Sequence, residues 1–234
     1  MLKIKIDLHT HTVDSNKYGS NVSKSSDDDI FYKLKTNNVK IVCFSDHLNF
    51  DKNQYLKRAS LGLEFKPEII VWPGIEIDIY LHDKNTRAQV IVVFNPSHDL
   101  AALEKFCQTN FNPDFNPLNF DKHSYAELIS LLTKEQYDFL IFPHVGKGVD
   151  FVYPTDIENQ RVDGLDSIKP DHKNVLKMRK HGIQAPVVCF SDTHDWENYP
   201  QHSYYWTWLT TESLAFNDVK QSILQHQITL KKCV

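Results

Sequence analysis

Short β-rich runs alternate with helical patterns along this chain, and this alternation limits the fold more than any other feature. The runs include LKIKIDLH, VKIVCFSD, PGIEIDIYL, YDFLIFPHV and APVVCFSD. Between them, segments such as SYAELISLLTKEQ place apolar residues on one helical face. A strand followed by a helix, repeated several times, predicts an α/β fold with a mainly parallel sheet covered by helices. One stretch, EIDIYLHDKNTRAQVIVVF, predicts an antiparallel hairpin that turns near residues 83–85.

Length and composition indicate one domain. A chain of 234 residues, of which 41% are hydrophobic, suits a single core, so we expect one domain over residues 1–234. The net charge of -4 excludes a global basic field of the kind that drives non-specific nucleic-acid binding, although a local basic patch is left open. The cysteines are scattered without CxxC pairing, which argues against a disulfide framework or a cysteine zinc site.

The apolar runs are all short. None approaches the roughly 20 residues that a membrane-spanning helix needs. The first residues, MLKIKIDLHTHT, lack the continuous apolar stretch of a signal peptide. We therefore predict a cytoplasmic protein that has no membrane partner.

The phrase VCFSD occurs twice, and each copy brings an Asp and a His to the end of a predicted strand. The first copy leads to Asp46 and His47, and the second leads to Asp192 and His194. In parallel α/β folds, side chains at the ends of strands converge while the strands hold them rigidly. We therefore expect these four residues to lie at one rim.

Three further strands end in the same way. IDLHTHT brings His9 and His11 to one face of a strand, WPGIEID brings Glu76, and LIFPHVG brings His144. A single His or Asp at a strand end is usually a hydrogen-bonded polar residue or a helix cap. Five strand ends with imidazoles and carboxylates are instead typical of a metal centre. This residue set favours Zn²⁺, Mn²⁺ or Fe²⁺, in a cluster of two or three ions.

Five motifs, DLHTHT, SDH, PGIE, PHVGKG and SDTHD, resemble in this order the metal-binding motifs of the polymerase and histidinol phosphatase (PHP) superfamily. The resemblance spans most of the chain. It implies a distorted seven-stranded β/α barrel of the TIM-like kind, with up to three divalent metal ions at its C-terminal rim. It also implies that the protein cleaves phosphate esters.

By position in these motifs, the resemblance also implies the ligands. Glu76 would bridge two ions, and Glu76, Asp192 and His194 are the candidate catalytic residues. The implied ligands are His9, His11, Glu76 and Asp192 for the first ion, Glu76 and His144 for the second, and His47 and His194 for the third.

Three charged residues near these ligands have supporting roles. We expect Asp7 and Asp46 to orient ligating imidazoles through the second ring nitrogen. Lys147 lies in the loop after His144, where it either contacts a substrate phosphate or is simply solvated.

Two positions depart from the family pattern. Where the family commonly has Asp or His after HTHT, this chain has Asn16, although Asp14 is close by and could substitute. A strand that usually carries a ligand histidine has Gln89, whose amide oxygen is a weaker ligand for a transition metal than imidazole. We therefore expect the second and third metal sites to hold their ions less firmly than the first.

These residues predict a metal-dependent phosphoesterase, either a phosphatase or a nuclease, that uses its metal cluster to activate water. The predicted substrate is a phosphorylated small molecule or a nucleic acid. Three segments, residues 16–27, 49–66 and 109–123, are candidate loops for substrate choice. Their aromatic side chains could stack on a base: Tyr18, Tyr55, Phe111, Phe115 and Phe120.

Two alternatives stay open. An amidohydrolase-like enzyme has a similar barrel, but it usually has a lysine between its metals where this chain offers Glu76. A degenerate PHP domain with a structural or partner-binding role would explain Asn16 and Gln89.

The final stretch, YYWTWLTTESLAFNDVKQSI, resembles the closing segment of PHP modules fused to P-loop ATPases. The chain has no GxxxxGK(S/T) motif, so an ATPase partner would lie outside this sequence. An amphipathic C-terminal helix that seals the bottom of the barrel explains the same residues, and both interpretations stay open.

Overall fold

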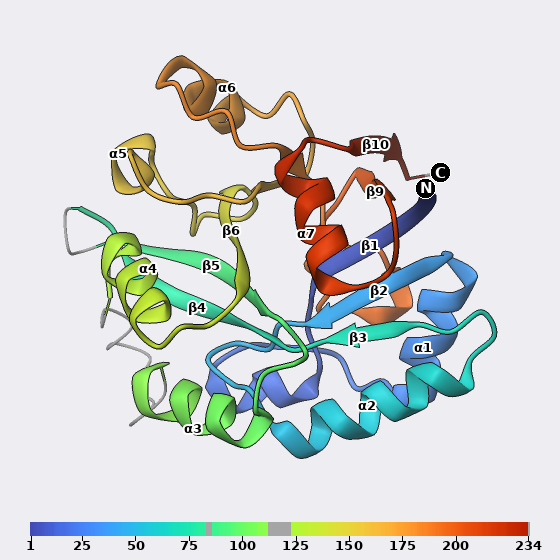
Figure 1. Ribbon diagram of the computed structural model, residues 1–234. Coiled ribbons are helices and arrows are strands. Elements are labelled where there is room, and N and C mark those ends of the chain that lie inside the picture. Colours follow the sequence, from blue (N-terminus) through green and yellow to red (C-terminus); the bar gives the residue numbers. More distant parts are fainter. Residues whose placement is uncertain (83–85, 112–122, 234) are drawn as a thin grey trace.

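The computed structural model describes residues 1–82, 86–111 and 123–233, and its described strands form two five-stranded sheets (Figure 1). The strands of the first sheet are, in spatial order, β10 (Ile228–Lys232), β9 (Tyr205–Thr211), β1 (Leu2–Thr10), β2 (Val39–Phe44) and β3 (Ile70–Trp72). Those of the second sheet are β4 (Gly74–Tyr80), β5 (Arg87–Phe94), β6 (Phe139–Gly146), β7 (Leu165–Ser167) and β8 (Val187–Val188).

Both sheets are mixed. In the first, β2 runs parallel to β1 and β3, whereas β9 is antiparallel to β1 and β10. In the second, β6, β7 and β8 are parallel, whereas β5 is antiparallel to β4 and β6. The predicted hairpin is confirmed as the β4–β5 pair, and its turn at residues 83–85 lies outside the described residues.

The prediction of a mainly parallel sheet is wrong. Phe94 at the end of β5 pairs with Phe139 at the start of β6, so the two strands are antiparallel. The segment that connects them begins and ends at the same end of the strands. Alternation of strands and helices in a sequence does not reveal this return, because it leaves the direction of each strand open.

Several of the helices follow residues whose side chains cap them. The α1 helix (Asp27–Thr36) follows Ser26, whose side chain accepts a backbone N–H bond. The α4 helix (Tyr125–Lys134) has a capping box made by Ser124 and Glu127. The remaining α-helices of the described residues are α2 (Lys52–Glu64), α3 (Leu100–Phe111), α5 (Pro154–Ile157), α6 (Lys173–Lys180) and α7 (Phe216–Leu224).

The expectation of a loop over residues 49–66 is wrong, because this segment contains α2. Asp51 caps the helix by accepting hydrogen bonds from the backbone N–H groups of Asn53 and Gln54, both at 2.9 Å. Gly62 brings the last turn close to the chain that enters β3, since a Cβ there would lie 2.2 Å from Ile69 O. The helix is therefore fixed against the first sheet.

The inner faces of the two sheets share one apolar cluster. Ile6 and Leu8 of β1 pack in it with Ile91 of β5, Phe142 of β6 and Val188 of β8, and all five are fully buried. Burial of such side chains is the main favourable contribution to folding. This cluster holds the strands whose ends carry the candidate ligands.

Two isolated bridges, Thr10 with Thr193 and His47 with Glu76, link the two sheets. β8 has only 2 residues. Beyond it the chain turns at Asp192, whose φ of 49° lies in the left-handed region. Within the described residues the ladders do not close, so the mixed α/β fold is clear but a seven-stranded TIM-like barrel is not confirmed.

Figure 1 shows α1, α2 and α3 along one side of the molecule. β10 pairs with β9, which pairs with β1, so the last strand of the chain lies in the same sheet as the first. The α7 helix packs on this sheet through Phe216, Val219 and Ile223, which are buried in the shared cluster. None of the helices among the described residues has the length and apolar character needed to cross a membrane.

Candidate metal centre

The ends of several strands bring the predicted ligands into one place. His9 lies in β1, Glu76 in β4 and His144 in β6, and the others follow β1, β2 and β8. They form three groups whose ligand atoms lie within 4.8 Å of one another: His11, His47 and His194; His9, Glu76 and His144; and His9, His11 and Asp192.

A buried hydrogen bond orients His9. Its Nδ1 lies 2.8 Å from Asp166 Oδ2, and both side chains are fully buried. This bond leaves Nε2 as the atom available to a metal ion. His9 Nε2 lies 3.0 Å from His11 Nε2 and 3.4 Å from Glu76 Oε1. Two imidazoles and a carboxylate therefore face one point.

Glu76 is the carboxylate at the centre of the site, and its side chain is 1% exposed. His47 Nδ1 lies 2.8 Å from Oε2, and His144 Nε2 lies 3.1 Å from Oε1. Both carboxylate oxygens and His144 Nε2 nevertheless have no partner in hydrogen-bond geometry among the described residues. Buried polar atoms seldom stay unpaired, and divalent cations would satisfy all three. The residues present therefore fit metal ions.

The charges of these groups depend on one another. Burial opposes ionisation of Glu76, but His47 and His11 outweigh it and hold the pKa of this carboxyl well below its usual value. In the same way, His9 outweighs burial and holds the pKa of Asp192 well below its usual value. Burial opposes a charge on His9, but Asp192 raises its pKa to about 10. The shifts of both carboxyls favour the ionised form, which is the form that binds metal ions.

Asp46 holds the segment after β1 against the end of β2. Its carboxylate accepts hydrogen bonds from Thr12 N at 2.6 Å, Thr12 Oγ1 at 2.8 Å and Ser15 Oγ at 2.7 Å. Ser15 Oγ lies 3.4 Å from His11 Nδ1 and accepts a bond from His47 N at 3.0 Å. Asp46 therefore reaches two ligand residues through Ser15 rather than directly.

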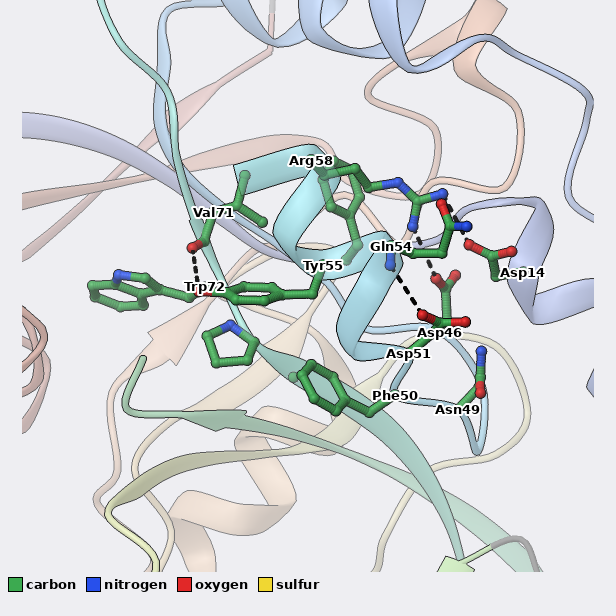
Figure 2. Close-up of a pocket in the computed structure, with 13 residues that line it drawn as sticks. Asp14, Asp46, Asn49, Phe50, Asp51, Gln54, Tyr55, Arg58, Val71 and Trp72 are labelled. Carbon is green, nitrogen blue, oxygen red and sulfur yellow. Dashed lines mark hydrogen bonds and ion pairs between the residues drawn. The ribbon is translucent and has the colours of Figure 1, made fainter. Parts of the chain in front are cut away.

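Behind Asp46 lies Arg58 of α2, with 7% of its side chain exposed (Figure 2). Its guanidinium contacts Asp14 at 2.9 Å, Asp27 at 3.0 Å and Asp46 at 3.9 Å, so one cation joins three segments. A cavity of about 20 Å³ beside Arg58 and Tyr55 has room for one water molecule. Asp14 is thus engaged by Arg58 and is in none of the three ligand groups.

Asp7 is in none of the three ligand groups, and the amide of Asn16 is engaged by the backbone. Asp7 accepts hydrogen bonds from Ser191 N at 2.9 Å and Tyr199 Oη at 2.8 Å, so it supports the end of β8 and not an imidazole. Asn16 bonds twice to the backbone of Val22, at 2.6 and 2.9 Å, and closes the loop between them.

Asp166 is the functional residue that sequence reasoning missed. It stands between Leu165 and Ser167 in the short strand of DGLDSI, where nothing in the local pattern marks it as a partner of a ligand. Lys147 lies 3.2 Å from Asp166 Oδ2, donates to Phe190 O, and is 1% exposed. Burial opposes ionisation of Asp166, but Lys147 outweighs it and lowers the pKa of this carboxyl. Lys147 is therefore neither solvated nor placed at a substrate phosphate.

A hollow of about 380 Å³ opens over the ligands, and we call it the mouth. Gln89 lines it, with 8% exposed, and its Nε2 lies 3.4 Å from His47 Nδ1. The mouth is lined by Tyr18, Gly19, Ser20, Asn21, His47, Glu76, Asp78, Arg87, Gln89, Asp150, Asp192, His194 and His202.

The aromatic side chains expected in substrate loops have different places. Tyr18 lines the mouth, whereas Tyr55 lies beside the cavity behind Asp46. Phe111 is buried in the core. Phe115 and Phe120 lie outside the described residues.

No family model and no curated protein matches this sequence, but solved structures match its fold. The lesion-specific endonuclease PfuEndoQ from Pyrococcus furiosus matches with a TM-score of 0.66 and 14% identity, over 98% of this chain and 58% of that one. An Endonuclease Q complex with a 27-mer duplex and an abasic lesion at the active site has a TM-score of 0.64 and 14% identity, over 95% and 56%.

A two-domain protein from Bacteroides vulgatus, described as containing a "predicted PHP-like metal-dependent phosphoesterase", has a TM-score of 0.61 and 10% identity, over 99% and 65% of the chains. This chain thus spans between 56% and 65% of the length of these three proteins. At such identities the likeness establishes the fold, which is the mixed α/β fold of these neighbours.

Arg58→Met should destabilise the protein by about 3 kcal/mol or more, because it leaves three carboxylates without their buried cation. Chemical denaturation followed by tryptophan fluorescence measures the change. Lys57→Met is the matched control, since Lys57 contacts the same Asp27 from a side chain that is 65% exposed. We expect less than about 1 kcal/mol there. Equal effects of the two substitutions would show that Arg58 does not hold the site together.

The wild type should bind at least one equivalent of Zn²⁺ or Mn²⁺. The double variant His9→Ala, His11→Ala should lose this metal, because each of the three ligand groups contains at least one of the two imidazoles. Equilibrium dialysis with elemental analysis measures the content. The control removes two imidazoles elsewhere, His82→Ala with His181→Ala. If both double variants retain the wild-type metal content, the ligand groups do not bind metal.

Proposed function

We propose that this protein is a metal-dependent phosphoester hydrolase, acting as a phosphatase or as a nuclease. The observation that carries the proposal is that four imidazoles lie within 3.6 Å of the buried, unpaired oxygens of Glu76, those of His9, His11, His47 and His144. Imidazoles and carboxylates without cysteine suit Zn²⁺, Mn²⁺ or Fe²⁺. We propose two to three such ions per chain.

Bound divalent ions supply a water molecule of lowered pKa and neutralise charge that builds on the phosphate. The residues of the chain have separate tasks. Glu76 lies between the imidazoles of His47 and His144 and keeps the ligand groups together. Asp192 and His194, with 14% and 25% of their side chains exposed, line the mouth and are the residues we assign to the attacking water and the leaving oxygen. Burial lowers the pKa of His194, so its neutral ring can bind metal or accept a proton.

The structural neighbours support a phosphorylated substrate of either class. Endonuclease Q in complex with a duplex supports a nucleic acid, whereas the PHP-like phosphoesterase supports phosphate esters in general. Because this chain covers 56% of the Endonuclease Q chain in that complex, nucleic acid and small phosphorylated molecules remain equal alternatives.

A degenerate domain with a structural or partner-binding role is the second candidate, and Asn16 and Gln89 are the residues in its favour. The complete convergence of the other ligands favours the enzyme. An ATPase partner, a single domain over residues 1–234, a cytoplasmic location and a barrel-like arrangement of strands remain predictions.

Glu76→Gln should abolish Mn²⁺-dependent hydrolysis, by at least about 100-fold in kcat, while the protein stays folded. The glutamine side chain has the same shape as that of Glu76, but it has one oxygen and no charge, so it cannot bind two metal ions at once. Phosphatase and nuclease assays with added Mn²⁺ measure the rate, and circular dichroism checks the fold. Glu135→Gln on the exposed end of α4 is the control. Activity of Glu76→Gln equal to that of the control would remove Glu76 from the mechanism.

Gln89→His should raise the affinity of the weaker metal sites, because an imidazole beside His47 is a stronger ligand than an amide. We expect the wild type to hold fewer than three ions tightly, and activity to depend on added metal. Calorimetric metal titration compares the two proteins, with the exposed Gln225→His as control. Three equally tight sites in the wild type would contradict the expectation that Gln89 weakens the centre.

A further inference from the structure

Unpaired buried atoms concentrate at the metal centre and its mouth. Among the described residues, five buried side-chain atoms have no hydrogen-bond partner: Ser20 Oγ, Glu76 Oε1 and Oε2, Asp78 Oδ1 and His144 Nε2. Metal ions account for the atoms of Glu76 and His144. The atoms of Ser20 and Asp78 belong to no ligand group but to residues that line the mouth.

The mouth has the chemistry of a site for a hydrophilic group. Tyr18 is the only aromatic residue apart from histidines in its described lining, and no aliphatic side chain takes part. Ser20 comes from the loop before α1, whereas Asp78 and Arg87 come from the paired strands β4 and β5. Polar groups therefore line the mouth from two separate parts of the fold.

Arg87 contacts one oxygen of the Asp78 carboxylate in this lining. Its guanidinium lies 3.4 Å from Asp78 Oδ2 and 2.6 Å from Asp150 Oδ2. The other oxygen of Asp78 is thus left as a free acceptor, and Arg87 still has N–H groups to donate, since a guanidinium carries five. A hydroxyl group can both donate to such an oxygen and accept from such an N–H.

We propose that the mouth recognises the alcohol part of the substrate and selects phosphate esters of hydroxyl-rich alcohols, as in sugar or polyol phosphates. The proposal rests on the proposed function, because the ligand groups would hold the phosphate. Substrate hydroxyls donate to Asp78 Oδ1 and accept from Arg87, and Ser20 Oγ bonds to them from the opposite loop. Rotation about the χ angles of Ser20 and Asp78 turns both atoms to such a ligand.

Two three-carbon esters test the selection. The Mn²⁺-loaded wild type should hydrolyse glycerol 1-phosphate with a kcat/KM at least about tenfold above that for n-propyl phosphate, because the propyl group leaves the polar lining unpaired. Asp78→Ala and Ser20→Ala should each move this ratio toward one. Asp171→Ala, at an exposed carboxylate away from the mouth, should keep the wild-type ratio. A wild-type ratio of one, or variants that change both substrates equally, overturns the proposal.

A binding experiment separates this proposal from the proposed hydrolysis. Calorimetry compares 2,3-dihydroxypropylphosphonate with n-propylphosphonate, which cannot be hydrolysed as esters, on the Mn²⁺-loaded wild type. Preference for the hydroxylated phosphonate without turnover of either ester supports the mouth and overturns the hydrolase. Equal binding of the phosphonates with equal turnover of the esters supports the hydrolase and overturns the selection.

Discussion

One buried carboxylate lies where the two sheets meet, and the imidazoles of the site depend on it. Glu76 is 1% exposed, and the imidazoles of His9, His47 and His144 lie 2.8 to 3.4 Å from its oxygens. Removing an ionised carboxylate from water is costly unless cations or donors compensate it. His9 and His47 come from the first sheet, and His144 and Glu76 from the second. The side chains of the candidate metal centre therefore also connect the two sheets, at a place where no strand ladder of the described residues connects them.

A second layer of charge supports the imidazoles. Asp166 holds His9 from β7, and the buried Lys147 compensates Asp166 in turn. On the other side, Asp46 acts through Ser15 and is compensated by Arg58 of α2. In each case the carboxylate lies between a cationic side chain and the ligand residues. Its negative charge is therefore balanced within the protein. Such partners orient a ligand before the metal arrives.

The ligands could be predicted from the sequence because each stands in a short motif at the end of a strand, where local pattern determines position. Asp166 could not, because its role depends on how β7 of the second sheet approaches His9 of β1 in the first. The orientation of Lys147 could not be predicted either, since a lysine among glycines reads the same whether its loop turns inward or outward. The prediction of strand directions was wrong for a related reason. The pairing of Phe94 with Phe139 depends on the path of the long segment that connects β5 to β6. The prediction of a loop over residues 49–66 missed the α2 helix, although Asp51 is an N-cap signal at its start.

The sharing of ligands sets a limit on the metal centre. Two of the three groups include His9, which has only Nε2 to offer because Nδ1 bonds Asp166. One nitrogen cannot complete both groups at once, so two neighbouring ions must draw on further donors. Asn16 is not such a donor without breaking its two bonds to Val22, whereas Gln89 stands at the mouth beside His47. The two departures from the family pattern are therefore not equivalent: one residue maintains a loop, and the other occupies a position from which a stronger ligand would reach the centre.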